Sequence, residues 1–192
     1  MGTMSRPVFP ATSRPFTVDD LLDMPDDGRR YELIDGVLFV SPSPTWAHQE
    51  MAAACYVLLR AQCPPELRVL IAPFAVQTSR SNEVQPDVIV ARYTDLTIAN
   101  LPVAPLLVVE ALSPSTELHD RNTKKAHYER IGVLAYWLLD PTEPGSIEVL
   151  ELDSDGRLQL IGTATGDETI TVQRPFRIEV CPARLLDGLR PQ

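Results

Sequence analysis

The stretch Leu106-Leu-Val-Val-Glu110 decides the fold, because four apolar residues run directly into a carboxylate. A short run that is apolar at every position is typical of a strand buried on both faces in the middle of a sheet. We therefore expect this strand at the sheet centre. Ionised carboxylates are very rarely buried without a cation or a hydrogen-bonding partner, so Glu110 requires a positive group or a donor nearby.

The residues after this strand predict a helix and a second buried strand. Residues 118 to 130 are polar and helical in pattern, and Gly132 is a suitable helix stop. Ala135-Tyr-Trp-Leu-Leu139 follows as another apolar run. The local order is therefore strand, helix, strand.

The C-terminal part predicts an antiparallel hairpin and a closing helix. The hairpin joins residues 147 to 152 with residues 158 to 165 through the Asp155-Gly156 turn. Residues 182 to 189 have the pattern of a short helix. Together with the preceding elements, this organisation predicts a mixed α/β fold.

The part before Leu106 predicts two helices, a hairpin and three strands. Thr17 is a suitable cap for a short helix through Met24, and residues 31 to 40 form a hairpin around the Asp35-Gly36 turn. A longer amphipathic helix is expected over residues 45 to 62. The three strands are residues 68 to 71, 74 to 78 and 88 to 91.

Length and composition bound the domain organisation. With 192 residues, of which 44% are hydrophobic, the chain can build one sizeable core. We expect a disordered or extended tail over residues 1 to 15, which carry three prolines, and a single domain over residues 16 to 192. No apolar run approaches the roughly 20 residues that cross a bilayer. The first residues lack a basic segment followed by an apolar core, so a cytoplasmic location is expected.

The charge and the cysteines limit the function classes. A net charge of −9 opposes broad electrostatic capture of nucleic acid, although a bound divalent ion can reverse the field locally. Cys55, Cys63 and Cys181 lack the spacing of a disulfide framework or a zinc site.

Two carboxylates stand where strands could hold them at one site. Asp87 immediately precedes the apolar run of residues 88 to 90, and Glu110 ends the run that starts at Leu106. Hard oxygen ligands from an Asp and a Glu on adjacent strands suit Mg²⁺ or Mn²⁺. The same residues could instead be solvated, or paired with a nearby arginine.

A lysine on the following helix would complete a phosphodiester-cleaving site. Lys124 and Lys125 are the candidates, and only one of them can point back to the strand ends. Asp120 lies one turn before Lys124 and could pair with it on the helix surface.

Six motifs in order resemble the Uma-type restriction endonucleases, a family within the PD-(D/E)xK nuclease superfamily. They extend over about 110 residues, which makes the combination more specific than any one motif. The motifs are Tyr31-Glu-Leu-Ile-Asp-Gly36; Ser41-Pro-Ser-Pro44 with His48; Gln85-Pro-Asp-Val88; Val108-Val-Glu110 with Leu112-Ser-Pro-Ser115; Asp120-Arg121 with Lys124 and Tyr128; and Tyr136-Trp-Leu-Leu-Asp-Pro141.

The resemblance implies a restriction-endonuclease-like mixed β-sheet flanked by helices, and homodimerisation. It implies that Asp87 and Glu110 bind the metal, that Lys124 is the catalytic lysine and that Glu32 is an additional acidic residue near the metal. Leu112 stands where the superfamily motif has its lysine, so Lys124 would replace that lysine from the following helix. His48 would be an accessory residue.

Other side chains have simpler interpretations. Glu32 could equally lie on the exposed face of an edge hairpin. Each histidine favours a structural or surface role, because the three are too dispersed for a local metal cluster. Trp46, Tyr136 and Trp137 are interpreted as packing residues, since no basic base-stacking stripe accompanies them.

Two hypotheses from different classes remain. The first is a Mg²⁺- or Mn²⁺-dependent endonuclease acting on DNA, in which Asp87 and Glu110 hold the metal and Lys124 stabilises charge or orients the attacking water. The second is a catalytically inactive nuclease-fold module that acts in protein association or regulation. The family resemblance and the set of two carboxylates with a lysine favour the first, whereas the acidity of the chain and Leu112 favour the second. We prefer the first.

Overall fold

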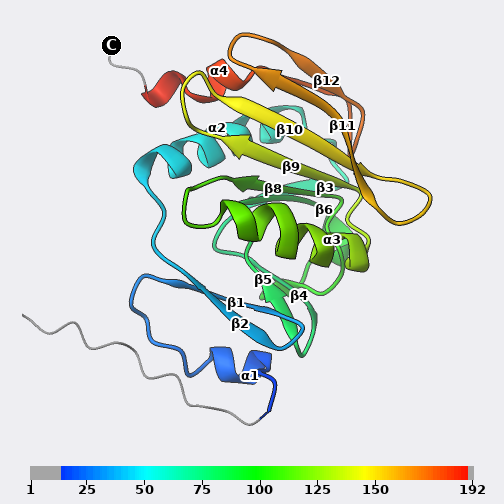
Figure 1. The fold of residues 1–192 in the computed structure, drawn as a ribbon. Helices are drawn as coiled ribbons and strands as arrows, with labels where there is room; N and C mark the ends of the chain where they lie inside the picture. The colour runs from blue at the N-terminus through cyan, green and yellow to red at the C-terminus, as the bar shows by residue number, and fades with distance from the viewer. Residues whose placement is uncertain (1–13, 190–192) are drawn as a thin grey trace, which may run out of the picture.

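A six-stranded sheet forms the centre of this computed structural model (Figure 1). Its strand order is β11-β10-β9-β8-β6-β3, so β8 (Leu107–Ala111) is a central strand, as predicted. It pairs in parallel with β9 (Ala135–Asp140) and antiparallel with β6 (Val88–Arg92). The other three strands are β3 (Leu67–Ile71), β10 (Ser146–Leu152) and β11 (Leu158–Thr165).

The structure describes residues 14 to 189. Of the tail expected over residues 1 to 15, residues 1 to 13 lie outside the described residues.

The central sheet is buried on both faces, which explains its uninterrupted apolar runs. Alternate residues of each strand point to opposite faces. One face packs against α2 (Trp46–Gln62) and α4 (Pro182–Leu185), and Val109 and Trp137 belong to it. Val108 and Tyr136 belong to the other face, which packs against α3 (Lys125–Ile131) and a smaller sheet.

The smaller sheet has the order β2-β1-β5-β4-β7 and lies below the central sheet in Figure 1. The predicted hairpin forms its edge, with Asp35 and Gly36 at positive φ in the turn. Two of its strands were not predicted, because β5 and β7 are only three and two residues long. Its strands are β1 (Arg30–Ile34), β2 (Val37–Ser41), β4 (Ala75–Ser79), β5 (Asn82–Val84) and β7 (Asn100–Leu101).

The helices lie where the sequence predicts them, with shorter bounds at both ends of the chain. The first, α1 (Val18–Leu21), has the expected capping box at Thr17. Before α3, residues His119–Lys124 form a π-helical turn, in which the backbone N–H of Lys125 donates to the carbonyl of Asp120. After α4 there is only a 3-10 turn (Asp187–Leu189), so the closing helix is shorter than expected.

The expected C-terminal hairpin is formed by β10 and β11, which pair antiparallel. A further antiparallel pair, β12 (Ile170–Val172) with β13 (Ile178–Val180), was not predicted. The fold is thus the mixed α/β arrangement of sheets flanked by helices that the sequence indicated. Over residues 14 to 189, every helix is too short or too polar to span a bilayer.

Candidate functional site

Strand register brings Asp87 and Glu110 together. Asp87 immediately precedes β6, and the pairing of Val88 with Val109 puts Glu110 opposite it at the next position. The backbone N–H of Ala111 donates to Asp87 Oδ2 across 2.9 Å. Both residues are buried, with exposed fractions of 3% for Asp87 and 2% for Glu110. Both point to the α3 face of the sheet, because they share the strand parity of Ile89 and Val108.

Glu32 reaches the same place from the smaller sheet. Glu32 and Ile34 lie on the same face of β1, the face that packs against the central sheet. Glu32 is only 1% exposed, so the interpretation as an exposed hairpin residue is wrong. Its Oε1 accepts the backbone N–H of Gln85 at 2.7 Å, which ties β1 to the segment before Asp87.

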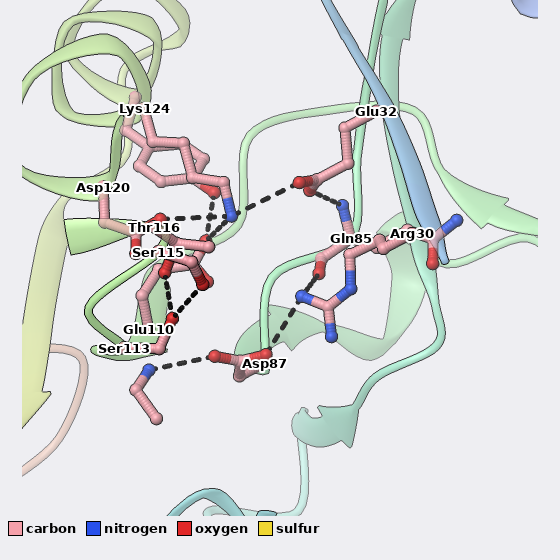
Figure 2. A network of polar contacts seen from close by, with 12 residues as sticks. Arg30, Glu32, Gln85, Asp87, Glu110, Ser113, Ser115, Thr116, Asp120 and Lys124 are labelled. Carbon is pink, nitrogen blue, oxygen red and sulfur yellow. Dashed lines mark hydrogen bonds and ion pairs between the residues drawn. The ribbon is translucent and has the colours of Figure 1, made fainter. Parts of the chain in front are cut away.

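Lys124, and not Lys125, faces the carboxylates (Figure 2). Its Nζ lies 2.9 Å from Glu110 Oε1 and 3.5 Å from Glu32 Oε2. It also lies 3.5 Å from Asp120 Oδ1. Because Asp120 and Lys124 are 2% and 4% exposed, the expectation of a surface pair on the helix is wrong. Lys125 instead lies 3.5 Å from a carboxylate of α3, that of Glu129.

Two further side chains contact Asp87. Arg30 had no predicted role at the site, and His48 had only an accessory one. Arg30 Nη1 lies 3.0 Å from Asp87 Oδ1, and His48 Nε2 lies 3.1 Å from Oδ2. Arg30 could have been found from the sequence, because it stands two residues before Glu32 on a strand and therefore on the same face. His48 comes from the first turn of α2, whose position relative to Asp87 is set by tertiary packing.

Two buried tyrosines hold the network in place. Tyr128 donates its hydroxyl to Glu110 Oε1 at 2.8 Å, and Tyr136 donates to the backbone carbonyl of Asp120 at 3.0 Å. Both are 0% exposed. The second bond adds a side-chain donor to the Asp120 carbonyl, which also accepts the backbone N–H of Lys125, and so supports the π-helical turn that carries Lys124.

Burial and neighbouring charge shift the pKa values in opposite directions. Burial raises the pKa of Glu110 to about 8. The charge of Lys124 opposes this rise, and repulsion from Asp87 adds to it. Burial alone would also raise the pKa of Asp87, but the hydrogen bond and charge of His48 hold it below its usual value. Burial alone would lower the pKa of Lys124, yet Glu110 and the other carboxylates raise it, so this lysine stays charged.

The side chains line a pocket of about 150 Å³ that carries excess negative charge. Four carboxylates, those of Glu32, Asp87, Glu110 and Asp120, face the two basic groups of Lys124 and Arg30. Without counting His48, these six groups have a formal excess of two negative charges. A buried excess of this kind favours uptake of a cation or a proton.

The donor set fits a hard divalent cation held largely by water. Mg²⁺ needs only one or two carboxylates and keeps several waters, so a pair such as Asp87 and Glu110 could hold it. Among residues 14 to 189, there is no ready group of three or more acidic, histidine or cysteine ligands.

The chain is similar in fold to a solved structure, a "putative nuclease belonging to DUF820 from Anabaena variabilis". The TM-score is 0.65 at 20% sequence identity, with 82% of this chain and 89% of the other covered. No curated protein matches the chain. The family model described as "Putative restriction endonuclease" matches residues 18 to 184, nearly the whole described chain. On this match, and with the acidic pair, the lysine and the fold in place, the chain belongs to the Uma2 family.

Proposed function

We propose that the protein is a metal-dependent endonuclease that hydrolyses phosphodiester bonds in DNA. The observation that carries the proposal is the pairing of Asp87 with Glu110 across adjacent strands, next to a buried lysine in a pocket of net negative charge. This combination supplies oxygen ligands, a cation and a surplus charge that a divalent ion would neutralise.

Asp87 and Glu110 would hold Mg²⁺ or Mn²⁺. When bound, such an ion acts as a Lewis acid on the phosphate and favours deprotonation of water. Asp87 is held for this role by the Ala111 N–H, Arg30 and His48, which leave it ionised and fix its orientation. Tyr128 fixes the Glu110 carboxylate in the same way.

Lys124 would orient the attacking water or stabilise charge on the phosphate. Its ammonium is held by Glu110, Glu32 and Asp120, so it is already positioned before substrate arrives. A preorganised cation at the point where negative charge develops lowers the barrier more than a mobile one. Glu32 acts through Lys124 and is assigned a positioning role.

The test is cleavage of plasmid, single-stranded and branched DNA with Mg²⁺ or Mn²⁺, beside an EDTA control. Asp87→Asn is the informative variant, because it keeps the shape of the side chain and removes its charge. Asp95→Asn is the matched control, since Asp95 is an aspartate in a partly exposed pair with Arg92. We expect Asp87→Asn to abolish both cleavage and Mn²⁺ binding by calorimetry, and Asp95→Asn to retain both.

If the folded wild-type protein cleaves none of these substrates, or cleaves them equally in EDTA, the proposal is wrong. Mn²⁺ binding that survives Asp87→Asn would contradict the assignment of the ligands. A folded, metal-free and inactive protein would favour the non-catalytic module instead.

A further inference from the structure

A wide groove opens from the Asp87 side of the pocket. It has a volume of about 840 Å³ and shares Arg30, His48 and Asp87 with the smaller pocket. Because the two hollows have these residues in common, they adjoin, and the groove is within reach of a polymer bound at the carboxylates. Its volume lies in the range in which proteins hold one small organic molecule, roughly 300 to 1,000 Å³.

An exposed tryptophan lines this groove. Trp46 begins α2 and is 69% exposed, so its interpretation as a packing residue is wrong, whereas Trp137 and Tyr136 are fully buried. An exposed indole offers a large flat surface on which a nucleobase can stack.

The groove has mixed charge and lacks a basic stripe. Arg29 and Arg30 line it together with three acidic residues, Asp26, Glu50 and Asp87. The Arg29 side chain is 44% exposed, and its Nε lies 3.4 Å from an oxygen of Asp27. With few cations available, phosphate contacts can contribute only part of the affinity for a nucleic acid. Base stacking would have to contribute the rest.

The wall that carries Trp46 is fixed by local contacts. Ser43 donates its hydroxyl to the carbonyl of Gly28 at 2.5 Å, which joins this wall to the turn before β1. Thr45 caps α2 by accepting the backbone N–H of His48 at 3.3 Å. Pro42 and Pro44 in the same segment have restricted backbones. The indole is therefore presented by a preorganised segment.

We propose that this groove binds an unpaired nucleotide next to the scissile phosphate, with its base stacked on Trp46 and its phosphate near Arg29. The substrate class is single-stranded or locally unpaired nucleic acid, since stacking on Trp46 requires a free base face. The inference rests on the proposed nuclease function, which it deepens by naming the form of the substrate.

The test measures binding without cleavage, in EDTA at low salt. The probes are a labelled oligothymidylate of about ten nucleotides, an abasic strand of the same length and a duplex. Anisotropy reports binding, and quenching of tryptophan emission reports stacking, since Trp137 is buried and Trp46 is exposed. The variants are Trp46→Ala and Trp46→Phe. Val57→Ala is the matched control, because Val57 is an exposed apolar residue of α2 outside the groove.

We expect oligothymidylate to bind best and to quench emission. Trp46→Ala should weaken binding about tenfold, the size of effect that loss of one stacked base produces. Trp46→Phe should largely restore binding, and Val57→Ala should leave it unchanged. The abasic strand should bind the wild-type protein as weakly as oligothymidylate binds Trp46→Ala.

Equal binding of the abasic and base-bearing strands, tighter binding of the duplex, or unchanged binding in Trp46→Ala would each overturn the inference. The inference would also be wrong if Trp46→Ala converted a dimer into a monomer, as measured by sedimentation, without changing oligonucleotide binding. Because the test does not require cleavage, base stacking in the groove can be disproved while Asp87-dependent cleavage is still observed. Conversely, stacking can hold in a protein that cleaves nothing.

Discussion

Lys124 Nζ lies 2.9 Å from Glu110 Oε1, and the two side chains are 5% and 2% exposed. The lysine is thus a buried cation among carboxylates, in the region where a divalent ion would also be attracted. A buried charge that loses its partner is costly, so in the absence of metal each of these two groups depends on the other. An ion bound by Glu110 must share that carboxylate with Lys124.

Lys124→Met should therefore separate metal binding from catalysis. Removing the competing cation should tighten Mn²⁺ binding, because the negative charge of the pocket rises, while cleavage should fall by about a hundredfold or more, as expected when one preorganised charge donor is lost. Calorimetry with Mn²⁺ and single-turnover cleavage would measure the two effects. Lys125→Met is the matched control, since Lys125 pairs only with Glu129 among the described carboxylates. Weaker Mn²⁺ binding in Lys124→Met would contradict this account.

Glu32→Gln should lower the rate of cleavage more than the affinity for metal. Glu32 holds Lys124 and accepts the Gln85 N–H, but is not assigned as a ligand. Glutamine can keep the hydrogen bond to the backbone while losing the charge opposite Lys124. The control is Glu83→Gln on β5, next to β1 in the same sheet. Loss of Mn²⁺ binding equal to that of Asp87→Asn would instead make Glu32 a ligand.

Tyr128→Phe should destabilise the protein, because it removes the hydrogen bond to Glu110. The lost hydroxyl donates to a carboxylate in a fully buried place, so the expected cost is about 1.5 to 3 kcal/mol. Tyr136→Phe removes a bond to a neutral carbonyl and should cost about 1 kcal/mol. Urea unfolding would measure both. An equal loss in the two variants would show that the carboxylate adds nothing to the Tyr128 bond.

His127 should make stability depend on pH below neutrality. It is 1% exposed, neither ring nitrogen has a hydrogen-bond partner among the described residues, and burial lowers its pKa to about 4 from a usual value of 6.5. The folded state therefore disfavours the protonated ring, whereas the unfolded chain accepts a proton near pH 6.5. Stability from this residue is complete above that pH and is lost as the pH falls toward 4, by up to about 3 kcal/mol.

The measurement is urea unfolding of the wild type and His127→Leu between pH 7 and 4. The difference in unfolding free energy between pH 7 and pH 5 should be smaller in the variant. Parallel pH profiles for the two proteins would contradict the assignment.

Much of the fold could be predicted because its signals are local. The apolar run ending at Glu110, the Asp35-Gly36 and Asp155-Gly156 turns and the Gly132 stop each specify their own element. The short strands β5, β7, β12 and β13 were missed, since two or three residues give too little periodicity to recognise. Trp46 was misread for a different reason, because the residue type favours burial and only the surrounding packing decides exposure.

The sequence by itself determined the strands that carry Asp87 and Glu110, their alternation and the helix that carries two candidate lysines. Only the tertiary structure decided that Lys124 is the lysine at the site, because the π-helical turn and the packing of the helix set the direction of each side chain. It also decided that Arg30 and His48 meet Asp87, across 57 and 39 positions of the chain. Such long-range contacts follow from how sheets and helices pack, and no local pattern encodes them.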